Sequence, residues 1–155
     1  NLMIVDLIRN DLSSVCTAQS ITVESLLALR SYSTVHQLES DVAGELADTK
    51  TGFDALSALF PGGSMTGAPK IRACALIAEL ENRPRGVYSG AIGWVSPSGD
   101  MDLGMVIRTA IFQKQTVSIS VGGGITSGSD PETEHAEMQL KALALVQAMG
   151  ASVNW

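Results

Sequence analysis

The sequence is poor in basic side chains. Its 155 residues carry 10 Lys and Arg against 16 Asp and Glu, which gives a formal net charge of -6. Binding the phosphate backbone of nucleic acid requires a dense surplus of basic side chains. We therefore expect no nucleic-acid partner, and a small anionic ligand would have to be held by local features of the fold.

Cysteines and long apolar runs are also scarce. Cys16 and Cys74 are the two cysteines, and neither has a CxxC or His-spaced partner, so neither a zinc site nor a disulfide framework is indicated. We expect buried thiols in a reducing compartment. No stretch approaches the roughly twenty apolar residues of a membrane span, and no signal peptide is recognisable. These absences predict a cytoplasmic protein without a membrane partner.

The composition that remains is that of a folded globular unit. Hydrophobic residues make up 45% of the chain and charged residues 17%, enough for one sizeable core. The chain opens on an apolar-periodic run without an initial Met or a capping residue, which suggests a piece of a longer protein. No repeat or linker divides it, so residues 1–155 are expected to form one domain or part of one.

Hydrophobic periodicity predicts a mixture of helices and antiparallel strands. The predicted helices are residues 2–12, 52–60, 69–83 and 131–149, the last with Asp130 as its cap. The predicted strands are residues 22–29, a second strand that begins at Thr34 after a break near 31–33, and then a meander of 86–96, 101–113 and 116–121. Because no βαβ alternation occurs, this order favours an α+β fold with antiparallel sheets covered by helices.

The last predicted helix carries two acidic residues on one face. Glu134 and Glu137 are three residues apart, so their carboxylates project from the helix about one turn apart. Magnesium commonly takes one or two protein carboxylates and completes its shell with water and ligand oxygens. Acidic residues in a first helical turn can equally serve only to offset the helix dipole. The two residues alone favour this second interpretation.

Two glycine-containing loops could approach an anion. The run Gly122-Gly123-Gly124 follows a strand, and its amides could reach a carboxylate, although a triple glycine can also be a flexible turn. It lacks the G-x-G-x-x-G pattern of a dinucleotide site. The loop 63–70 lacks the Lys-Ser/Thr pair of a phosphate loop, yet it places a hydroxyl and amides beside a helix N-terminus, a favourable position for an anion.

Two further polar residues lie in predicted strands. Arg108 is flanked by apolar neighbours, and a buried guanidinium needs a partner. That partner is either a structural carboxylate or the carboxylate of a ligand, and both interpretations stay open. His36 and Gln37 project from opposite faces of one strand, so only one of them can face a given site.

Six motifs occur in an order and spacing similar to the chorismate-binding enzymes. This family comprises anthranilate synthase component I, aminodeoxychorismate synthase component I, and the isochorismate and salicylate synthases. The motifs are VDLIRND (5–11), VHQLESDVAGEL (35–46), FPGGSMTGAPK (60–70), SGAIGW (89–94), VIRT (106–109) and GGGITSGSDPETEHAE (122–137). The resemblance covers nearly the whole chain and implies the C-terminal part of the chorismate-binding fold.

The resemblance also implies roles for particular residues. Glu134 and Glu137 match magnesium ligands, and Gln37 and Thr66 match catalytic positions. The implied substrate-binding residues are Thr66, Gly67, Arg108, Gly122, Gly123, Gly124 and Lys141. Chorismate is a dianion, so an acidic protein must receive it with a cation, an arginine and backbone amides.

Gln37 distinguishes between the activities in the family. Anthranilate synthases carry a histidine at this position, where it assists the loss of pyruvate, and a neutral amide cannot act as an acid or base near neutral pH. The resemblance therefore implies the synthase component of aminodeoxychorismate synthase, which aminates chorismate for p-aminobenzoate and folate biosynthesis with ammonia from a glutamine amidotransferase partner. The alternatives are anthranilate synthase component I and a non-catalytic fragment. The fragment alternative arises because the remaining magnesium-site glutamates are expected upstream of residue 1, so the chain alone should be inactive.

Overall fold

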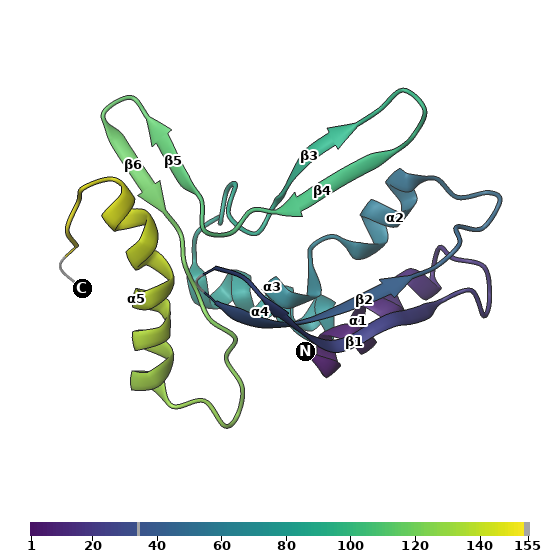
Figure 1. The fold of residues 1–155 in the computed structure, drawn as a ribbon, viewed down its shortest axis with the longest axis horizontal. Helices are drawn as coiled ribbons and strands as arrows, with labels where there is room; N and C mark the ends of the chain where they lie inside the picture. Colours follow the sequence, from purple (N-terminus) through teal and green to yellow (C-terminus); the bar gives the residue numbers. More distant parts are fainter. Residues whose placement is uncertain (34, 154–155) are drawn as a thin grey trace. The chain divides into compact units, whose positions relative to one another are not determined.

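The computed structural model describes residues 1–33 and 35–153 (Figure 1). Helices and short antiparallel sheets alternate along it, which confirms the predicted α+β class. In chain order the elements are α1 (Leu2–Ser13), β1 (Thr22–Ser31), β2 (His36–Ala43), α2 (Gly52–Leu59), α3 (Gly63–Thr66), α4 (Lys70–Glu81), β3 (Ala91–Val95), β4 (Met101–Met105), β5 (Ala110–Gln113), β6 (Thr116–Ile119) and α5 (Pro131–Ala148).

The chain divides into two compact units. The first unit contains residues 1–84 and 93–102, and the second contains residues 85–92 and the chain from Leu103 onward. The β3–β4 hairpin contributes residues to both units.

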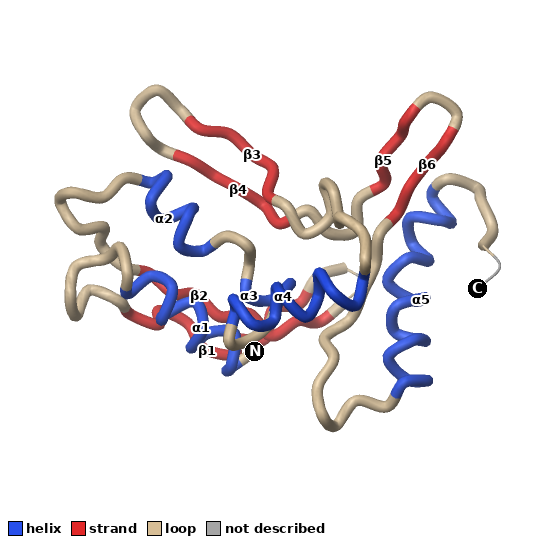
Figure 2. The backbone as a smooth tube through the Cα atoms, turned by 180° about the vertical axis from the view of Figure 1, so that it is seen from behind, coloured by secondary structure: helices blue, strands red, loops and turns tan. Residues whose placement is uncertain are grey.

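The first unit is built on the β1–β2 hairpin and the helix α1. The strands pair antiparallel, with Ser31 opposite His36 at the hairpin end, and the register shifts where Leu27 adopts a φ of 53°. Helix α1 packs against β2 and also contacts α2 and α3 (Figure 2). Val5 in α1 and Val15, which follows this helix, are buried apolar side chains of the unit. The predicted second strand is confirmed from His36 onward, whereas Thr34 lies outside the described residues.

Local signals account for most of the helices in the first unit. Helix α2 begins with a reciprocal capping box between Thr51 and Asp54. The segment after it, which the sequence predicts as loop, contains the short helix α3, because the amides of Met65 and Gly67 donate to the carbonyls of Gly62 and Gly63. Helix α4 then begins directly after Pro69, close to the predicted position.

The second unit contains the β5–β6 hairpin and the helix α5, which runs beside it in both views (Figures 1 and 2). The hairpin pairs Gln113 with Thr116 at its turn. Helix α5 begins as the sequence predicts, because the Asp130 carboxylate accepts a hydrogen bond from the Thr133 amide and Pro131 occupies the first helical position. This start places Glu134 in the first turn.

The predicted three-stranded meander is wrong. Residues 86–89 form turns and β3 begins only at Ala91, while the predicted strand 101–113 is divided into β4 and β5. Strand β3 pairs with β4 and β5 pairs with β6, in separate two-stranded sheets. The segment that divides them contains Arg108, whose φ of 49° is left-handed and not extended.

Apolar periodicity predicts the helices better than it predicts burial. Helix α4 contains no buried residue, and Ile71 and Leu80 on it are 89% and 81% exposed. Cys16 and Cys74 are free, as expected, but they are half-buried and not fully buried. Among the described residues, no helix has both the length and the apolar character that crossing a membrane requires.

Candidate functional site

The residues that the sequence singles out lie in both units. Gln37, Thr66 and Gly67 belong to the first unit, and the others belong to the second. The second-unit group is Arg108, Gly122, Gly123, Gly124, Glu134, Glu137 and Lys141.

Glu134 is held between a hydroxyl and a glycine. Its side chain is half-buried at the start of α5, and its Oε1 accepts a 2.7 Å hydrogen bond from Ser129 Oγ. A β-carbon added at Gly123 would lie 3.0 Å from Glu134 Oε2. The missing side chain at Gly123 therefore lets this carboxylate lie against the backbone of the triple-glycine run.

Ser129 is a residue of this site that the sequence analysis did not identify. Its hydroxyl accepts a hydrogen bond from the Thr126 amide at 3.0 Å, and its own amide donates to the Thr126 carbonyl at 3.1 Å. A serine hydroxyl has one proton to donate, and here that proton goes to Glu134. The sequence contained a signal for this residue. Ser129 directly precedes the cap Asp130, and its hydroxyl is five positions from Glu134, a candidate metal ligand.

Glu137 and Lys141 connect α5 to the triple-glycine run by a second route. Lys141 Nζ lies 2.6 Å from Glu137 Oε1 and donates to the Gly122 carbonyl at 3.2 Å. The hydrogen bond from Lys141, and then its positive charge, lower the pKa of the Glu137 carboxyl below its usual value. Glu137 is 51% exposed and Lys141 30% exposed, so this pair is partly screened by solvent.

Tyr88 also reaches the triple-glycine run and was not identified from the sequence. A β-carbon added at Gly122 would lie 3.0 Å from the Tyr88 hydroxyl. The Arg85 guanidinium lies over the Tyr88 ring, 5.8 Å from its centre. The tyrosine therefore places a phenol beside the glycine whose carbonyl Lys141 binds.

An open hollow of about 380 Å³ lies beside these groups. Gly122, Gly123, Ser129, Glu134 and His135 line it together with apolar side chains. Glu134 and Ser129 thus border a space that a small ligand can enter.

The donor set suits part of a magnesium site. Within residues 1–33 and 35–153, no group of three or more His, Cys, Asp or Glu side chains is arranged to hold a metal ion. Two carboxylates on one helix do not make a closed protein cage, but one or two carboxylates are what magnesium commonly takes before water and ligand oxygens. Glu134 and Glu137 fit that limited role, and Glu137 meanwhile pairs with Lys141.

Arg108 lies where the sequence analysis did not expect it. It is exposed, in the segment between β4 and β5, and makes no hydrogen bond or ion pair with the described residues. The expectation of an arginine inside a strand is therefore wrong: β4 ends at Met105, and the backbone at Arg108 is left-handed and not extended. The sequence left two partners open for Arg108, a structural carboxylate or the carboxylate of a ligand. No structural carboxylate binds it among the described residues.

The first-unit group centres on α3. Thr66, its last residue, is half-buried and donates its hydroxyl to the Gly62 carbonyl at 3.2 Å. Gly67 follows with φ 115° and ψ -174°, a conformation that glycine adopts readily and other residues avoid.

Gln37 lies on β2 opposite Arg30. Its side chain is exposed and forms no hydrogen bond with the part of the chain that the structure describes. The Gln37 amide is therefore free to bind a ligand. None of the described residues pairs with it, so it remains an uncharged amide.

The sequence and fold match those of known proteins. Residues 1–147 match the family model described as chorismate binding enzyme. An aminodeoxychorismate synthase of Streptomyces pristinaespiralis is 50% identical over 149 residues, which are 96% of this chain and 21% of that protein. An anthranilate synthase component 1 of Aquifex aeolicus is 43% identical over 149 residues, which are 96% of this chain and 30% of that protein.

A solved structure is similar as well. The anthranilate synthase component I of Streptococcus pneumoniae TIGR4 superposes with a TM-score of 0.87 at 42% identity, covering 93% of this chain and 33% of that one. The chain thus spans between about a fifth and a third of the length of these relatives.

Proposed function

Because this chain belongs to the chorismate-binding enzyme family, we propose that its full-length protein is the synthase component of an aminodeoxychorismate synthase. In the proposed reaction, ammonia forms a carbon–nitrogen bond to the chorismate ring and the ring hydroxyl leaves, while the enolpyruvyl group is retained. The product would supply p-aminobenzoate for folate biosynthesis.

The observation that carries this choice is Gln37. A relative named aminodeoxychorismate synthase is 50% identical to the chain, against 43% for one named anthranilate synthase component 1. The exposed Gln37 amide cannot exchange a proton near neutral pH, so it cannot provide the acid–base assistance that pyruvate loss would require. Amination without pyruvate loss is the reaction that fits this residue.

Glu134 and Glu137 are the residues that would hold Mg²⁺ in the second unit. A bound magnesium ion would supply Lewis-acid polarisation of a substrate carboxylate. The protein groups around it have separate roles: Ser129 orients Glu134, and Lys141 orients Glu137 and can meet a ligand oxygen. Arg108, with no partner among the described residues, is available for a carboxylate, and Thr66 and Gly67 are assigned to the ring by the family resemblance.

The test uses the full-length protein. It is incubated with chorismate, Mg²⁺ and ammonium, and the product is identified by mass. We expect an amine that retains the enolpyruvyl group, and omission of Mg²⁺ should abolish its formation. Recovery of anthranilate with release of pyruvate would refute the proposal.

The ammonia donor can be tested in the same assay. We propose a glutamine amidotransferase subunit or domain as the partner, so glutamine should replace ammonium only when that activity is present. A full-length protein that uses glutamine without any amidotransferase would contradict the proposed partner.

A further inference from the structure

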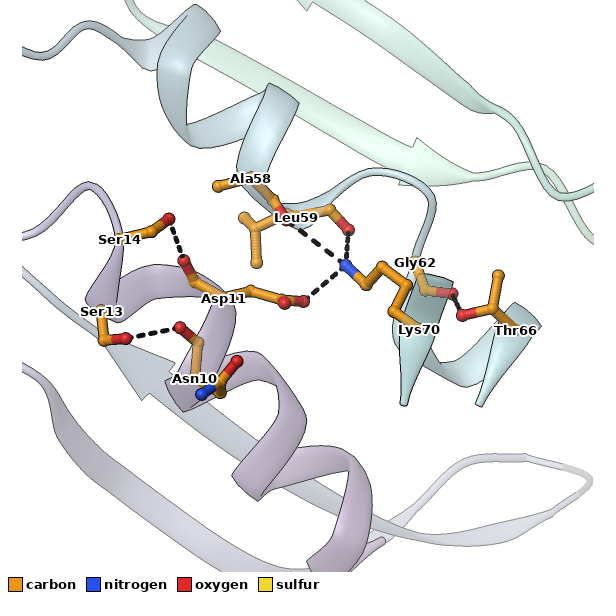
Figure 3. Close-up of polar contacts among 9 residues, drawn as sticks. All are labelled: Asn10, Asp11, Ser13, Ser14, Ala58, Leu59, Gly62, Thr66 and Lys70. Atoms are coloured by element: carbon orange, nitrogen blue, oxygen red, sulfur yellow. Dashed lines mark hydrogen bonds and ion pairs between the residues drawn. The ribbon is translucent and has the colours of Figure 1, made fainter. Parts of the chain in front are cut away.

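Lys70 and Asp11, which are 59 positions apart in sequence, form an ion pair that is largely shielded from solvent (Figure 3). Lys70 Nζ lies 2.6 Å from Asp11 Oδ2, and the two side chains are 15% and 12% exposed. The same ammonium donates to the carbonyls of Ala58 and Leu59 at 3.3 and 3.1 Å. Its three N–H groups therefore have three acceptors.

This arrangement closes the segment that carries Thr66. Ala58 and Leu59 are the last residues of α2, and Lys70 is the first residue of α4, so the ammonium ties together the two ends of residues 60–69. Positive charge at a helix C-terminus is favourable, because the last carbonyls lack partners within the helix.

Helix α1 holds the same segment at its middle. A β-carbon added at Gly63 would overlap the Leu7 side chain, so α3 approaches α1 closely at this glycine. Leu7 and Asp11 are four residues apart and lie on one face of α1. One face of α1 thus contacts the 60–69 segment twice. Leu7 packs against Gly63, and Asp11 binds Lys70, the residue that follows the segment.

We propose that Asp11 and Lys70 are positioning residues that set the placement of Thr66 and Gly67. The inference rests on the proposed function, in which these two residues lie beside the chorismate ring. Asp11 and Lys70 act through the 60–69 segment, because the lysine has no N–H left for a ligand and both side chains are largely shielded.

The experiment compares Asp11→Asn and Lys70→Met with Asp6→Asn and Arg9→Met in the full-length protein. Asp6 and Arg9 form an exposed ion pair on the same helix, so these two variants make the same charge changes outside the segment. Misplacement of a reacting group by about 1 Å can cost about 100-fold in rate. We expect Asp11→Asn and Lys70→Met to lower kcat/KM for chorismate about 10- to 100-fold, and the two control variants to change it less than about twofold.

A double-mutant cycle separates positioning from general stability. If Lys70 acts through Thr66, Lys70→Met should cost little in a Thr66→Ala background, at a temperature where all variants are folded. Full additivity of the two effects would overturn the proposal. Asp11→Asn, which preserves side-chain size, carries the same test should Lys70→Met fold poorly.

Hydrogen exchange gives a readout that does not depend on the reaction. The amides of residues 62–68 should exchange faster in Lys70→Met than in Arg9→Met, and unchanged exchange there would overturn the proposal. If the wild-type protein fails to convert chorismate, the proposed function fails, and the exchange comparison still decides whether the ion pair positions the segment.

Discussion

Replacing Gly123 with alanine should weaken magnesium binding by displacing one carboxylate. The added β-carbon would lie 3.0 Å from Glu134 Oε2, about 0.4 Å inside the shortest ordinary contact of 3.4 Å. Glu134 cannot simply retreat, because Ser129 holds its other oxygen at 2.7 Å. The carboxylate must either leave its favoured rotamer, at about 0.5–1.5 kcal/mol, or stretch a hydrogen bond to a charged group worth about 1.5–3 kcal/mol.

These costs set the expected magnitude. Each 1.4 kcal/mol corresponds to about a tenfold change in an equilibrium constant. The cheaper of the two responses sets the cost, so we expect Gly123→Ala to raise the magnesium concentration for half-maximal activity about 2- to 12-fold in the full-length protein. Calorimetric titration of Mg²⁺ should give the same shift in the dissociation constant.

Gly124 provides the matched control. No heavy atom outside its immediate chain neighbours lies within 4 Å of a β-carbon added there, and its φ is not in the left-handed region. Gly124→Ala should leave magnesium binding within about twofold of the wild type. Equal magnesium dependence in the two variants would refute the argument that Gly123 makes room for a metal-binding Glu134.

Three further substitutions test neighbouring contacts. Ser129→Ala removes the hydrogen bond to Glu134, and loss of such an outer partner typically weakens metal binding about 10- to 100-fold; an unchanged Mg²⁺ dissociation constant by calorimetry would contradict this. Lys141→Met should raise the pKa of Glu137 toward its ordinary value, seen by NMR titration without Mg²⁺. Because the folded-state pKa is the lowered one, the stability that the pair contributes is present at neutral pH and is lost as the pH falls through that pKa. Wild type and variant should therefore differ in denaturant midpoint at pH 7 and converge in acid. Gly63→Ala forces a methyl group into Leu7 and should cost about 1–3 kcal/mol of unfolding free energy in a denaturant titration, where Gly124→Ala changes little.

Four helices could be predicted from the sequence because their signals are local. The Asp130 cap, Pro131 at the first position and the apolar spacing all lie within the segment that forms α5. Nothing local marks Arg108 as left-handed. That conformation accompanies long-range hydrogen bonds, in which Val106 donates to the Gly90 carbonyl and accepts from the Ser89 amide. The strand boundaries were therefore missed together with the exposure of the arginine.

The sequence identifies candidate site residues but does not predict the contacts that hold them. Helical spacing predicts that Glu134 and Glu137 lie about one turn apart, and both belong to α5. It does not reveal that one is held by Ser129 and the other by Lys141, although a Glu and Lys four residues apart could have been read as a helical pair. Asp11 and Lys70 are 59 positions apart, and no short-range pattern connects them.

Comparison of the two lysines shows why they should have different roles in an acidic protein. Each binds one carboxylate and at least one backbone carbonyl, so each offsets local negative charge. Lys70 is 15% exposed and its three N–H groups are matched by three acceptors, so binding a ligand would require it to break an existing contact. Lys141 is 30% exposed and has two acceptors among the described residues, which leaves one N–H for a ligand oxygen. Lys141 can therefore meet a substrate carboxylate while it still holds Glu137 and Gly122, whereas Lys70 can affect the substrate only through the segment that it closes.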